Sequence, residues 1–328
     1  MRLRETPEDF RVEEIPLYAP SGEGEHTFVR VEKRLRTTEE LARDLARAAG
    51  VPPRDVGYAG RKDRRAVTTQ WLSVPGLDPG AALALELPGA RVLEAVAHPH
   101  KLRTGQLRGN RFEIAVRGVD EPSAAAAVQT AARLLRTGLP NRFGEQRFGR
   151  EGRNDALAAA LLRGERVRGG RRELRFLLSA LQARVFNAAL DERGLPPHQL
   201  EPGDLAMRHD SGGLFRVEDL ARESARAEAF EISPTGPIFG TKMPEAAGRV
   251  AERERALLER FGLAPESLRP PRGLRLHGGR RPLRVPIGEW EAACDADVLR
   301  LRFALPAGSY ASVLIECLFE PAQTGDAA

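Results

Sequence analysis

Short stretches near the start of the chain alternate between apolar and polar residues. Phe10 and Val12 alternate with charged neighbours, and residues 27–33 repeat the pattern with valines on one side. A repeat of two residues sends successive side chains to opposite faces of a strand, so the pattern predicts two strands, each with one buried face. The glycine-containing residues 21–25 lie between them, and we interpret this segment as a hairpin turn.

A helical repeat follows these strands. Thr37 and Glu40 have the spacing of a capping box, Leu41 and Leu45 share one helical face, and Gly50 ends the pattern. Similar signals predict further helices later in the chain. They run from Ser123 to Gly138, from Asn154 to Gly164, from Arg172 to Arg193 and from Glu245 to Arg260.

Two more strands are predicted on either side of this helical section. The first carries Phe112, Ile114 and Val116, and the second, which alternates most regularly, carries Leu299, Leu301, Phe303 and Leu305. Between them, residues 138–149 hold too many glycines for a regular helix, residues 233–240 are rich in turn-forming proline and glycine, and residues 278–282 are typical of a loop.

Composition narrows the class of protein. The chain has 328 residues, of which 41% are hydrophobic, so it is long enough for two lobes. Lys and Arg number 51 against 46 Asp and Glu, and the formal net charge of +5 suits a polyanionic partner such as nucleic acid. Only four of the 51 basic residues are lysines, so nucleotide bias in the genome is an equal explanation for the arginines.

Several function classes are disfavoured. Cys294 and Cys317 have neither metal-ligand spacing nor the pattern of a disulfide framework, which is typical of a reducing cytosol. The run His98-Pro99-His100 has no carboxylate or cysteine at ligand spacing, so we do not interpret it as a metal site. Because no stretch has the ~20 apolar residues of a membrane span and no signal peptide is visible, we expect a cytoplasmic protein without membrane contact.

The most informative stretch surrounds Asp63. Four cations, Arg61, Lys62, Arg64 and Arg65, adjoin this carboxylate in a turn opened by glycines. Nearby positive charge favours an ionised carboxylate, so the turn suits a catalytic acid group that faces a polyanion. A solvated charged turn is the alternative that charge alone leaves open.

This stretch resembles the signature of the TruD family of transfer-RNA pseudouridine synthases, a Gly-x-Lys-Asp-x-x-Ala-x-Thr-x-Gln run that carries the nucleophilic aspartate. The matching residues are Gly60, Lys62, Asp63, Ala66, Thr68 and Gln70. Further runs resemble family motifs in the same order, at 109–112, 140–149, 179–187, 233–240 and 303–311. The resemblance extends from Pro7 to Ala311, and a chance match of this many ordered motifs is remote.

The resemblance implies a fold, a reaction and a partner. The fold is α+β, with a mixed, mainly antiparallel sheet in a catalytic domain formed by residues 1–139 and 279–328, and a mostly helical inserted TRUD domain at 140–278. The reaction is the conversion of uridine 13 in the D arm of transfer RNA into pseudouridine, without a cofactor or a metal. The implied partner is transfer RNA, and a monomer with no obligatory protein partner is expected.

The resemblance also implies site residues. Asp63 corresponds to the catalytic carboxylate, and Arg4 falls where relatives carry a lysine that pairs with it. A guanidinium stays protonated and can engage both carboxylate oxygens, so the substitution would hold Asp63 ionised and oriented. The residues implied to contact or enclose the uridine are Phe10, Asn110, Phe112 and Phe303.

Alternatives remain at this point. A non-catalytic RNA-binding or RNA-chaperone protein would show the same composition, and each of the aromatic residues could belong to the core. An RNA methyltransferase is disfavoured because no glycine-rich strand-to-helix turn for its donor is visible. The match also weakens at the end, since Glu316-Cys317 stands where relatives commonly carry Arg-Glu.

Overall fold

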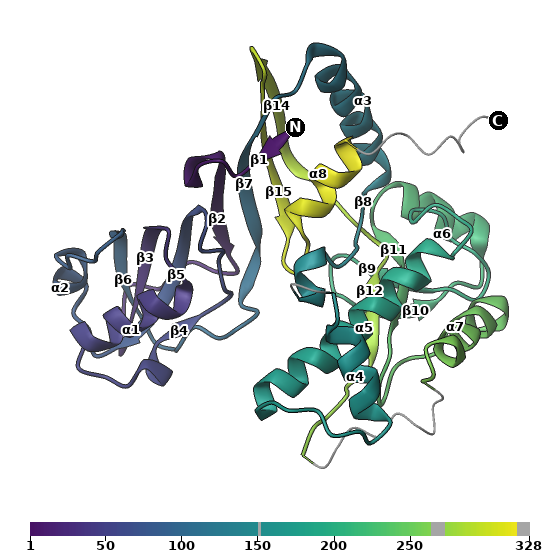
Figure 1. Cartoon of the computed structure of the whole chain (residues 1–328), viewed down its shortest axis with the longest axis horizontal. Coiled ribbons are helices and arrows are strands. Elements are labelled where there is room, and N and C mark those ends of the chain that lie inside the picture. The colour runs from purple at the N-terminus through teal and green to yellow at the C-terminus, as the bar shows by residue number, and fades with distance from the viewer. Residues whose placement is uncertain (150–151, 264–272, 320–328) are drawn as a thin grey trace. The chain divides into compact units, whose positions relative to one another are not determined.

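The computed structural model describes residues 1–149, 152–263 and 273–319, which form two compact units (Figure 1). Unit 1 consists of Met1–Gln129 and Ile287–Gly308, and unit 2 of Thr130–Pro286 and the described residues from Ser309 onward. The domain division implied by the resemblance has neighbouring bounds but joins the last helix to the first domain, and it stays a prediction.

Unit 1 is built on a nine-stranded sheet. Its strands are β1 (Arg2–Leu3), β2 (Phe10–Pro16), β3 (His26–Arg34), β4 (Gly57–Tyr58), β5 (Val67–Pro75), β6 (Ala90–His98), β7 (Leu107–Arg117), β14 (Gly288–Asp295) and β15 (Val298–Pro306). Its helices are α1 (Thr38–Ala48) and α2 (Pro79–Leu83), and α3 (Glu121–Thr137) leads into unit 2. Short 3-10 turns precede β2 at Pro7–Asp9 and β4 at Pro53–Asp55.

The strand order along the sheet is β14-β15-β7-β2-β5-β3-β6, with β1 paired to β7 and β4 paired to β5. The β2–β5 pair is parallel, and the other pairs are antiparallel. Strands from both ends of the chain therefore complete one sheet, as Figure 1 shows for the purple and yellow strands. The expected α+β class with a mixed, mainly antiparallel sheet is confirmed.

The hairpin expected at residues 21–25 is absent from unit 1, because β5 lies between β2 and β3. Almost every residue of β5 is buried, including Trp71, Leu72 and Val74. A strand that is apolar on both faces is most stable in the middle of a sheet. This central position of β5 separates two strands that are neighbours in sequence.

Helix α1 covers one face of this sheet. Its capping box forms as predicted, since the Thr37 side chain accepts a hydrogen bond from the Glu40 backbone N–H and the Glu40 carboxylate accepts one from the Thr37 N–H. Leu41 and Leu45 of α1 are fully buried and belong to one core cluster with residues of β3 and β5. The cluster fixes the start of α1 above the sheet, close to the loop that contains Asp63.

Unit 2 combines helices with two small sheets. Its helices are α4 (Asn154–Leu162), α5 (Arg171–Asp191), α6 (Leu220–Glu228), α7 (Gly248–Arg260) and α8 (Ala311–Phe319), with a 3-10 turn at Glu145–Phe148. One sheet has the order β10-β9-β11-β12, from Leu214–Arg216, Leu205–Arg208, Ile232–Ile238 and Gly279–Pro282. The other pairs β13 (Arg284–Val285) with β8 (Leu139–Pro140). The section expected to be mostly helical thus also contains a sheet.

Two segments of unit 2 differ from the sequence-based prediction. Residues 233–240, expected to be turn-rich, largely form β11, and residues 278–282, expected to be a loop, largely form its partner β12. Residues 232–237 are all buried, so their backbone groups need the partners that β9 and β12 supply. Asn154, expected to cap α4, is instead its first helical residue.

The core of unit 2 lies around α5. Leu177, Leu178, Leu181 and Val185 are buried in one cluster with apolar residues of α4 and α7. The prediction that α5 is a core helix is therefore confirmed. No helix within the described residues has both the length and the apolar character needed to cross a bilayer.

Candidate active site

Asp63 lies in the loop between β4 and β5, with its side chain 43% exposed. Arg4 Nη2 donates a hydrogen bond to Asp63 Oδ2 at 3.0 Å. Arg4 follows the short strand β1 and has a left-handed backbone with φ of 57°, which turns the chain at this point. Two residues 59 positions apart thus form an ion pair at the surface of unit 1.

Arg4 is held from a second direction by Phe10. The Arg4 Cζ atom lies 3.8 Å from the Phe10 ring centroid, a cation–π contact. The Arg4 guanidinium binds Asp63 Oδ2 only. No described residue donates a hydrogen bond to Asp63 Oδ1. Asp63 is therefore oriented through Oδ2 while Oδ1 stays available to a substrate.

The four cations next to Asp63 in sequence do not surround its carboxylate. Three of them have partners elsewhere in unit 1, and these contacts turn their side chains away. The contacts are Arg61 Nε to Glu39 Oε1 at 2.5 Å, Lys62 Nζ to Glu14 Oε2 at 2.6 Å and Arg64 Nε to the Leu35 carbonyl at 3.2 Å. The expectation of a carboxylate crowded by its neighbours is wrong for these three cations, because their side chains bind groups on other parts of unit 1.

Lys62 and Glu14 form a buried ion pair below the loop. The Lys62 ammonium is 2.6 Å from Glu14 Oε2, and Glu14 Oε1 accepts a hydrogen bond from the Trp71 backbone N–H. Both side chains are almost fully removed from solvent. The pair ties the residue before Asp63 to β2 and β5, which explains the Lys of the motif as a structural residue.

Breaking this pair should destabilise unit 1 strongly. In Lys62→Met the Glu14 carboxylate stays buried without its counter-charge, and we expect a loss of about 3–5 kcal/mol in the free energy of unfolding. Urea unfolding would measure it. Arg61→Met, which breaks an exposed pair on the same loop, is the matched control and should cost less than about 1 kcal/mol. Equal losses in the two variants would contradict the anchoring role of Lys62.

Thr38 and Gln70 hold the loop from the other side. The Lys62 backbone N–H donates to Thr38 Oγ1 at 3.0 Å, and Thr38 Oγ1 donates to Gln70 Oε1 at 2.8 Å. Gln70 Nε2 reaches the Gly60 carbonyl at 3.4 Å. Both side chains are fully buried. The Gly, Lys and Gln of the motif therefore form one scaffold that fixes the backbone around Asp63.

Lys33 is a residue of this site that the sequence-based prediction missed. Its ammonium donates to the backbone carbonyls of Arg36 at 2.7 Å and of Asp63 at 2.9 Å. The side chain is fully buried, and this burial lowers the pKa of Lys33 to about 8. The signal was present in the sequence, because the strand repeat places Lys33 on the same face as the apolar Val29 and Val31.

The lowered pKa of Lys33 predicts a pH effect on stability. Between about pH 8 and the ordinary lysine pKa of 10.5, the unfolded state binds more protons than the folded state. The free energy of unfolding should therefore rise with pH through this group, by at most about 3 kcal/mol. Urea unfolding of the wild type and Lys33→Met at several pH values from 7 to 9.5 would show it. Parallel curves for the two proteins would contradict the prediction.

The four residues expected to contact or enclose the uridine lie on neighbouring strands. Phe10, Phe112 and Phe303 form a row, with ring centroids 6.2 Å apart for the first pair and 5.2 Å for the second. Phe112 and Phe303 are register partners on β7 and β15. Phe303 is fully buried and Phe112 is 7% exposed, so Phe303 supports Phe112 from behind and presents no free ring face.

Asn110 lies on the same face of β7, two residues before Phe112. Its side-chain oxygen is buried and has no hydrogen-bond donor among the residues that the structure describes. A buried acceptor without a hydrogen bond lowers the stability of the folded protein by about 1–3 kcal/mol. A buried acceptor of this kind is typical of a position where a bound ligand supplies the donor. Asn110 thus places a polar group beside the row of aromatic rings.

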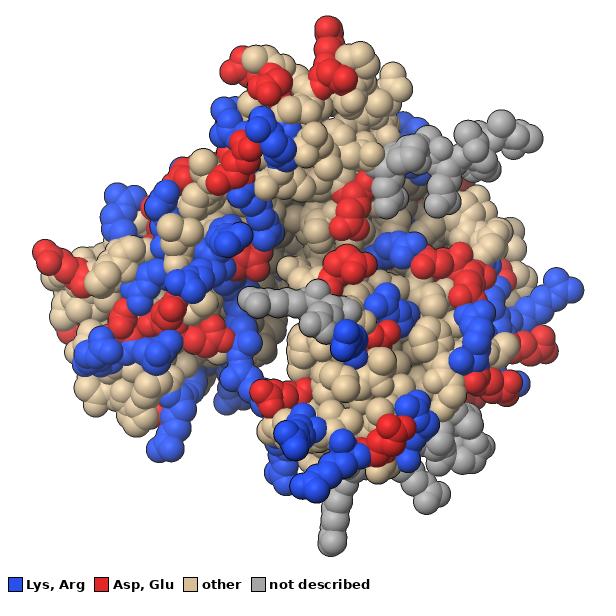
Figure 2. Space-filling view, in the orientation of Figure 1, with Lys and Arg blue, Asp and Glu red and all other residues tan. Residues whose placement is uncertain are grey.

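Several cations of the described residues lie beside carboxylates. Figure 2 shows blue and red side chains interspersed over the visible surface of both units. In unit 1, for example, Arg111 pairs with both Glu13 and Glu289. Within the described ranges, no group of three or more His, Cys, Asp or Glu side chains could hold a metal ion.

Comparisons with known proteins agree on one family. A family model described as tRNA pseudouridine synthase D (TruD) matches residues 1–168 and 171–317. The tRNA pseudouridine synthase D of Anaeromyxobacter dehalogenans (strain 2CP-1) is 50% identical over 325 residues, covering 95% of this chain and 91% of that protein. The protein of the same name from Thermus thermophilus is 44% identical over 317 residues, covering 95% and 87%.

A solved structure shares the fold. The crystal structure of a Methanosarcina mazei protein named for tRNA pseudouridine synthase D (TruD) matches with a TM-score of 0.77 and 22% sequence identity. The match covers 98% of this chain and 93% of that one. The arrangement of strands and helices described above is therefore found in a distant relative.

Proposed function

The chain belongs to the tRNA pseudouridine synthase D (TruD) family, and we propose that it isomerises a uridine of transfer RNA to pseudouridine with Asp63 as the catalytic carboxylate. The observation that carries the choice of residue is the ion pair between Arg4 Nη2 and Asp63 Oδ2, which leaves Oδ1 without a donor among the described residues. A carboxylate fixed by one oxygen and open at the other is suited to act on a bound substrate.

The reaction needs little beyond such a carboxylate. The bond from uracil N1 to ribose C1′ breaks, the base turns, and C5 bonds to C1′, while C5 loses a proton and N1 gains one. Neither an electron nor a group is supplied from outside, so we propose that the chain works without a cofactor. Asp63 Oδ1 serves any of three routes: attack on the sugar carbon, addition to the pyrimidine ring, or removal of a ribose proton.

The target uridine has to leave its base stack to reach Asp63. We propose that the uracil then lies against the exposed edge of Phe112, with its N3–H donated to the unpaired oxygen of Asn110. Phe10 links this row to Arg4 by a cation–π contact, and Phe303 holds Phe112 in place. In this proposal Phe112 and Asn110 contact the uracil. Phe10 and Phe303 support the residues around it.

The proposal includes finer points that follow from the family resemblance. Uridine 13 of the D arm is the proposed target, and the chain is proposed to act in the cytoplasm as a monomer. The direct test is incubation of the purified protein with unmodified transfer-RNA transcripts, followed by mapping of pseudouridine. Pseudouridine at position 13 is expected, and a transcript with cytidine at 13 is the control. Tight RNA binding without isomerisation would favour the alternative of a non-catalytic RNA-binding or RNA-chaperone protein.

Replacement of Phe112 should weaken uridine capture. Contact of the uracil with the exposed edge of Phe112 removes apolar area of both groups from water, so Phe112→Ala should lower kcat/KM by about five-fold or more. Steady-state kinetics would measure it, with Phe112→Leu as the variant that keeps the packing against Phe303 and loses the aromatic ring. An unchanged kcat/KM in a stably folded variant would assign Phe112 to the core alone.

A further inference from the structure

Three family-like motifs that the Asp63 site does not use meet at one hollow in unit 2. The runs at 140–149 and 179–187 and strand β11 supply most of its wall, and β12 supplies the rest. The lining residues are Phe143, Arg147, Ser179, Gln182, Ile238, Arg280, Arg281 and Pro282, around a volume of about 340 Å³. All of them belong to unit 2, and none is among the residues described above around Asp63 in unit 1.

Arg147 is a cation of this pocket that has no carboxylate partner among the described residues. Its Nε atom is buried and has no hydrogen-bond partner among the described residues. The guanidinium instead lies between two rings, with Cζ 6.0 Å from the Phe143 centroid and 5.2 Å from the Phe176 centroid. A partly exposed guanidinium with a buried, unpaired Nε and no carboxylate beside it among the described residues is a ready partner for a phosphate group.

Phe143 is held in a fixed position beside Arg147. Arg281 Cζ lies 4.2 Å from its ring centroid, and the Arg281 Nε donates to the Asn141 carbonyl at 3.1 Å. Phe186 packs edge-on against the same ring at 5.6 Å. Burial lowers the pKa of Arg281 to about 10, and the charge of Arg147 contributes to this lowering. Two guanidinium groups therefore act on one pocket that also contains a rigid aromatic ring.

The remaining polar atoms of the pocket are acceptors. Gln182 Nε2 donates to the Phe239 and His277 carbonyls at 2.5 and 2.9 Å, which leaves its amide oxygen for a ligand. Ser179 Oγ donates to the Phe176 carbonyl at 2.7 Å and keeps its lone pairs. Both residues lie one turn apart on α5, so their acceptors lie on the same helical face.

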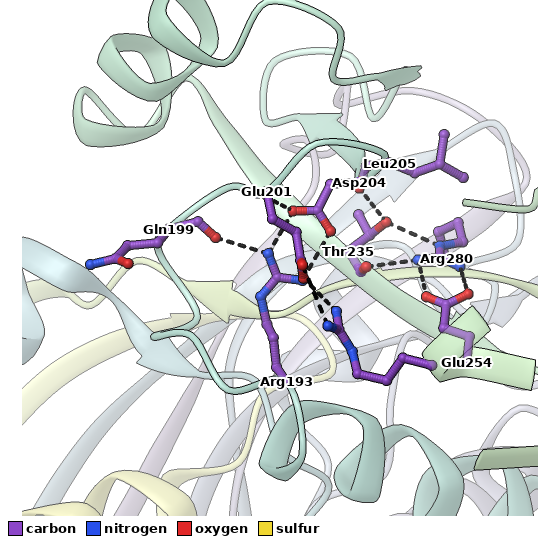
Figure 3. A network of polar contacts seen from close by, with 9 residues as sticks. Arg193, Gln199, Glu201, Asp204, Leu205, Thr235, Glu254 and Arg280 are labelled. Atoms are coloured by element: carbon purple, nitrogen blue, oxygen red, sulfur yellow. Dashed lines mark hydrogen bonds and ion pairs between the residues drawn. The ribbon is translucent and has the colours of Figure 1, made fainter. Parts of the chain in front are cut away.

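Arg280 lines the pocket but binds other protein groups and stabilises the pocket wall. Figure 3 shows its guanidinium directed at Glu254 and Thr235, and its two contacts with the Glu254 carboxylate measure 2.8 and 2.7 Å. The neighbouring pair of Arg193 and Asp204 is buried in the same network. The Arg280 contacts fix β12 against β11 and α7, so the pocket is preformed.

We propose that this pocket binds one nucleotide of the transfer RNA other than the target uridine. Its phosphate pairs with Arg147, its base stacks on Phe143, and donors on the base edge bind the acceptors of Ser179 and Gln182. The inference rests on the proposed function, since it takes transfer RNA as the ligand. It adds a second contact that unit 2 makes on its own.

The test compares binding of a transfer-RNA transcript by three variants at several salt concentrations. Arg147→Gln should raise Kd by about five- to ten-fold and reduce the slope of log affinity against log salt by about one, because one phosphate contact is lost. Phe143→Leu should raise Kd with an unchanged slope, because it removes stacking and no charge. Arg222→Gln, an exposed arginine on α6 outside the pocket, is the matched control and should leave Kd within about two-fold.

In Arg147→Gln and Phe143→Leu, kcat at saturating RNA should stay at the wild-type value, because the pocket binds and does not react. Wild-type Kd and salt slope in both variants would overturn the proposal, and so would a lowered kcat with unchanged Kd. Binding is measured without turnover, so the result is separate from the Asp63 assignment. A wild-type protein that makes no pseudouridine while Arg147→Gln still weakens binding would count against the proposed reaction alone.

Discussion

Asp63→Asn should lower the rate of pseudouridine formation by at least about 10³-fold while leaving the Kd for transfer RNA within about two-fold. The amide keeps the size of the side chain, and its oxygen can still accept the hydrogen bond from Arg4 Nη2. What it loses is the negative charge and the reactive oxygen. Single-turnover assays with excess enzyme would measure the chemical step, and filter binding would measure Kd.

A second Asp-to-Asn variant on unit 1 serves as the control. Asp55 lies in the short 3-10 turn before β4, so Asp55→Asn makes the same chemical change near the same loop. It should retain full activity. Pseudouridine formation by Asp63→Asn at more than a few per cent of the wild-type rate would remove Asp63 from the catalytic role and return it to the class of solvated turn residues.

Arg4→Ala should lower kcat by about 10²-fold with a much smaller effect on RNA binding. Among the described residues, Arg4 is the one that donates a hydrogen bond to the Asp63 carboxylate. Removal of one preorganised donor from a reacting charge typically lowers kcat by 10²- to 10³-fold. The pair contributes little to folding, because its side chains are 36% and 43% exposed and such pairs are worth ~0–1 kcal/mol. The melting temperature should therefore stay close to that of the wild type.

The conservative variant separates orientation from structure. Arg4→Lys keeps a positive charge that can reach Asp63 and should recover a large part of the lost kcat, although it loses part of the contact with Phe10. Arg2→Ala, which removes an exposed neighbouring arginine, should have no effect on kcat. If Arg4→Ala leaves kcat unchanged, the ion pair with Asp63 has no part in the reaction.

The sequence by itself was informative wherever a signal is local. The capping box of Thr37 and Glu40 predicts the start of α1, because both partners lie within one turn. The alternation of Leu299 to Leu305 predicts β15, since the side-chain period of a strand is set by the backbone alone. The family resemblance, read from short ordered motifs, is confirmed by the match over residues 1–168 and 171–317.

Local sequence patterns gave the wrong prediction where burial or distant partners determine the secondary structure or the strand order. The proline and glycine of 233–240 predict turns, but a buried segment must pair its backbone, and this requirement produced β11. The segment 21–25 predicts a hairpin, but the apolar residues on both faces of β5 placed that strand between β2 and β3. Neither outcome follows from the residues of the segment itself.

The surroundings of Asp63 show the same division. The sequence determined which carboxylate carries the motif and which cations stand beside it in the chain. Only the tertiary structure decided that Lys62 turns to Glu14, that Arg4 binds Asp63 Oδ2, and that the Lys33 ammonium holds the Asp63 carbonyl. The physical reason is that adjacent side chains of this loop bind different partners, so the charge that acts on the carboxylate comes from whichever segment the fold brings against it.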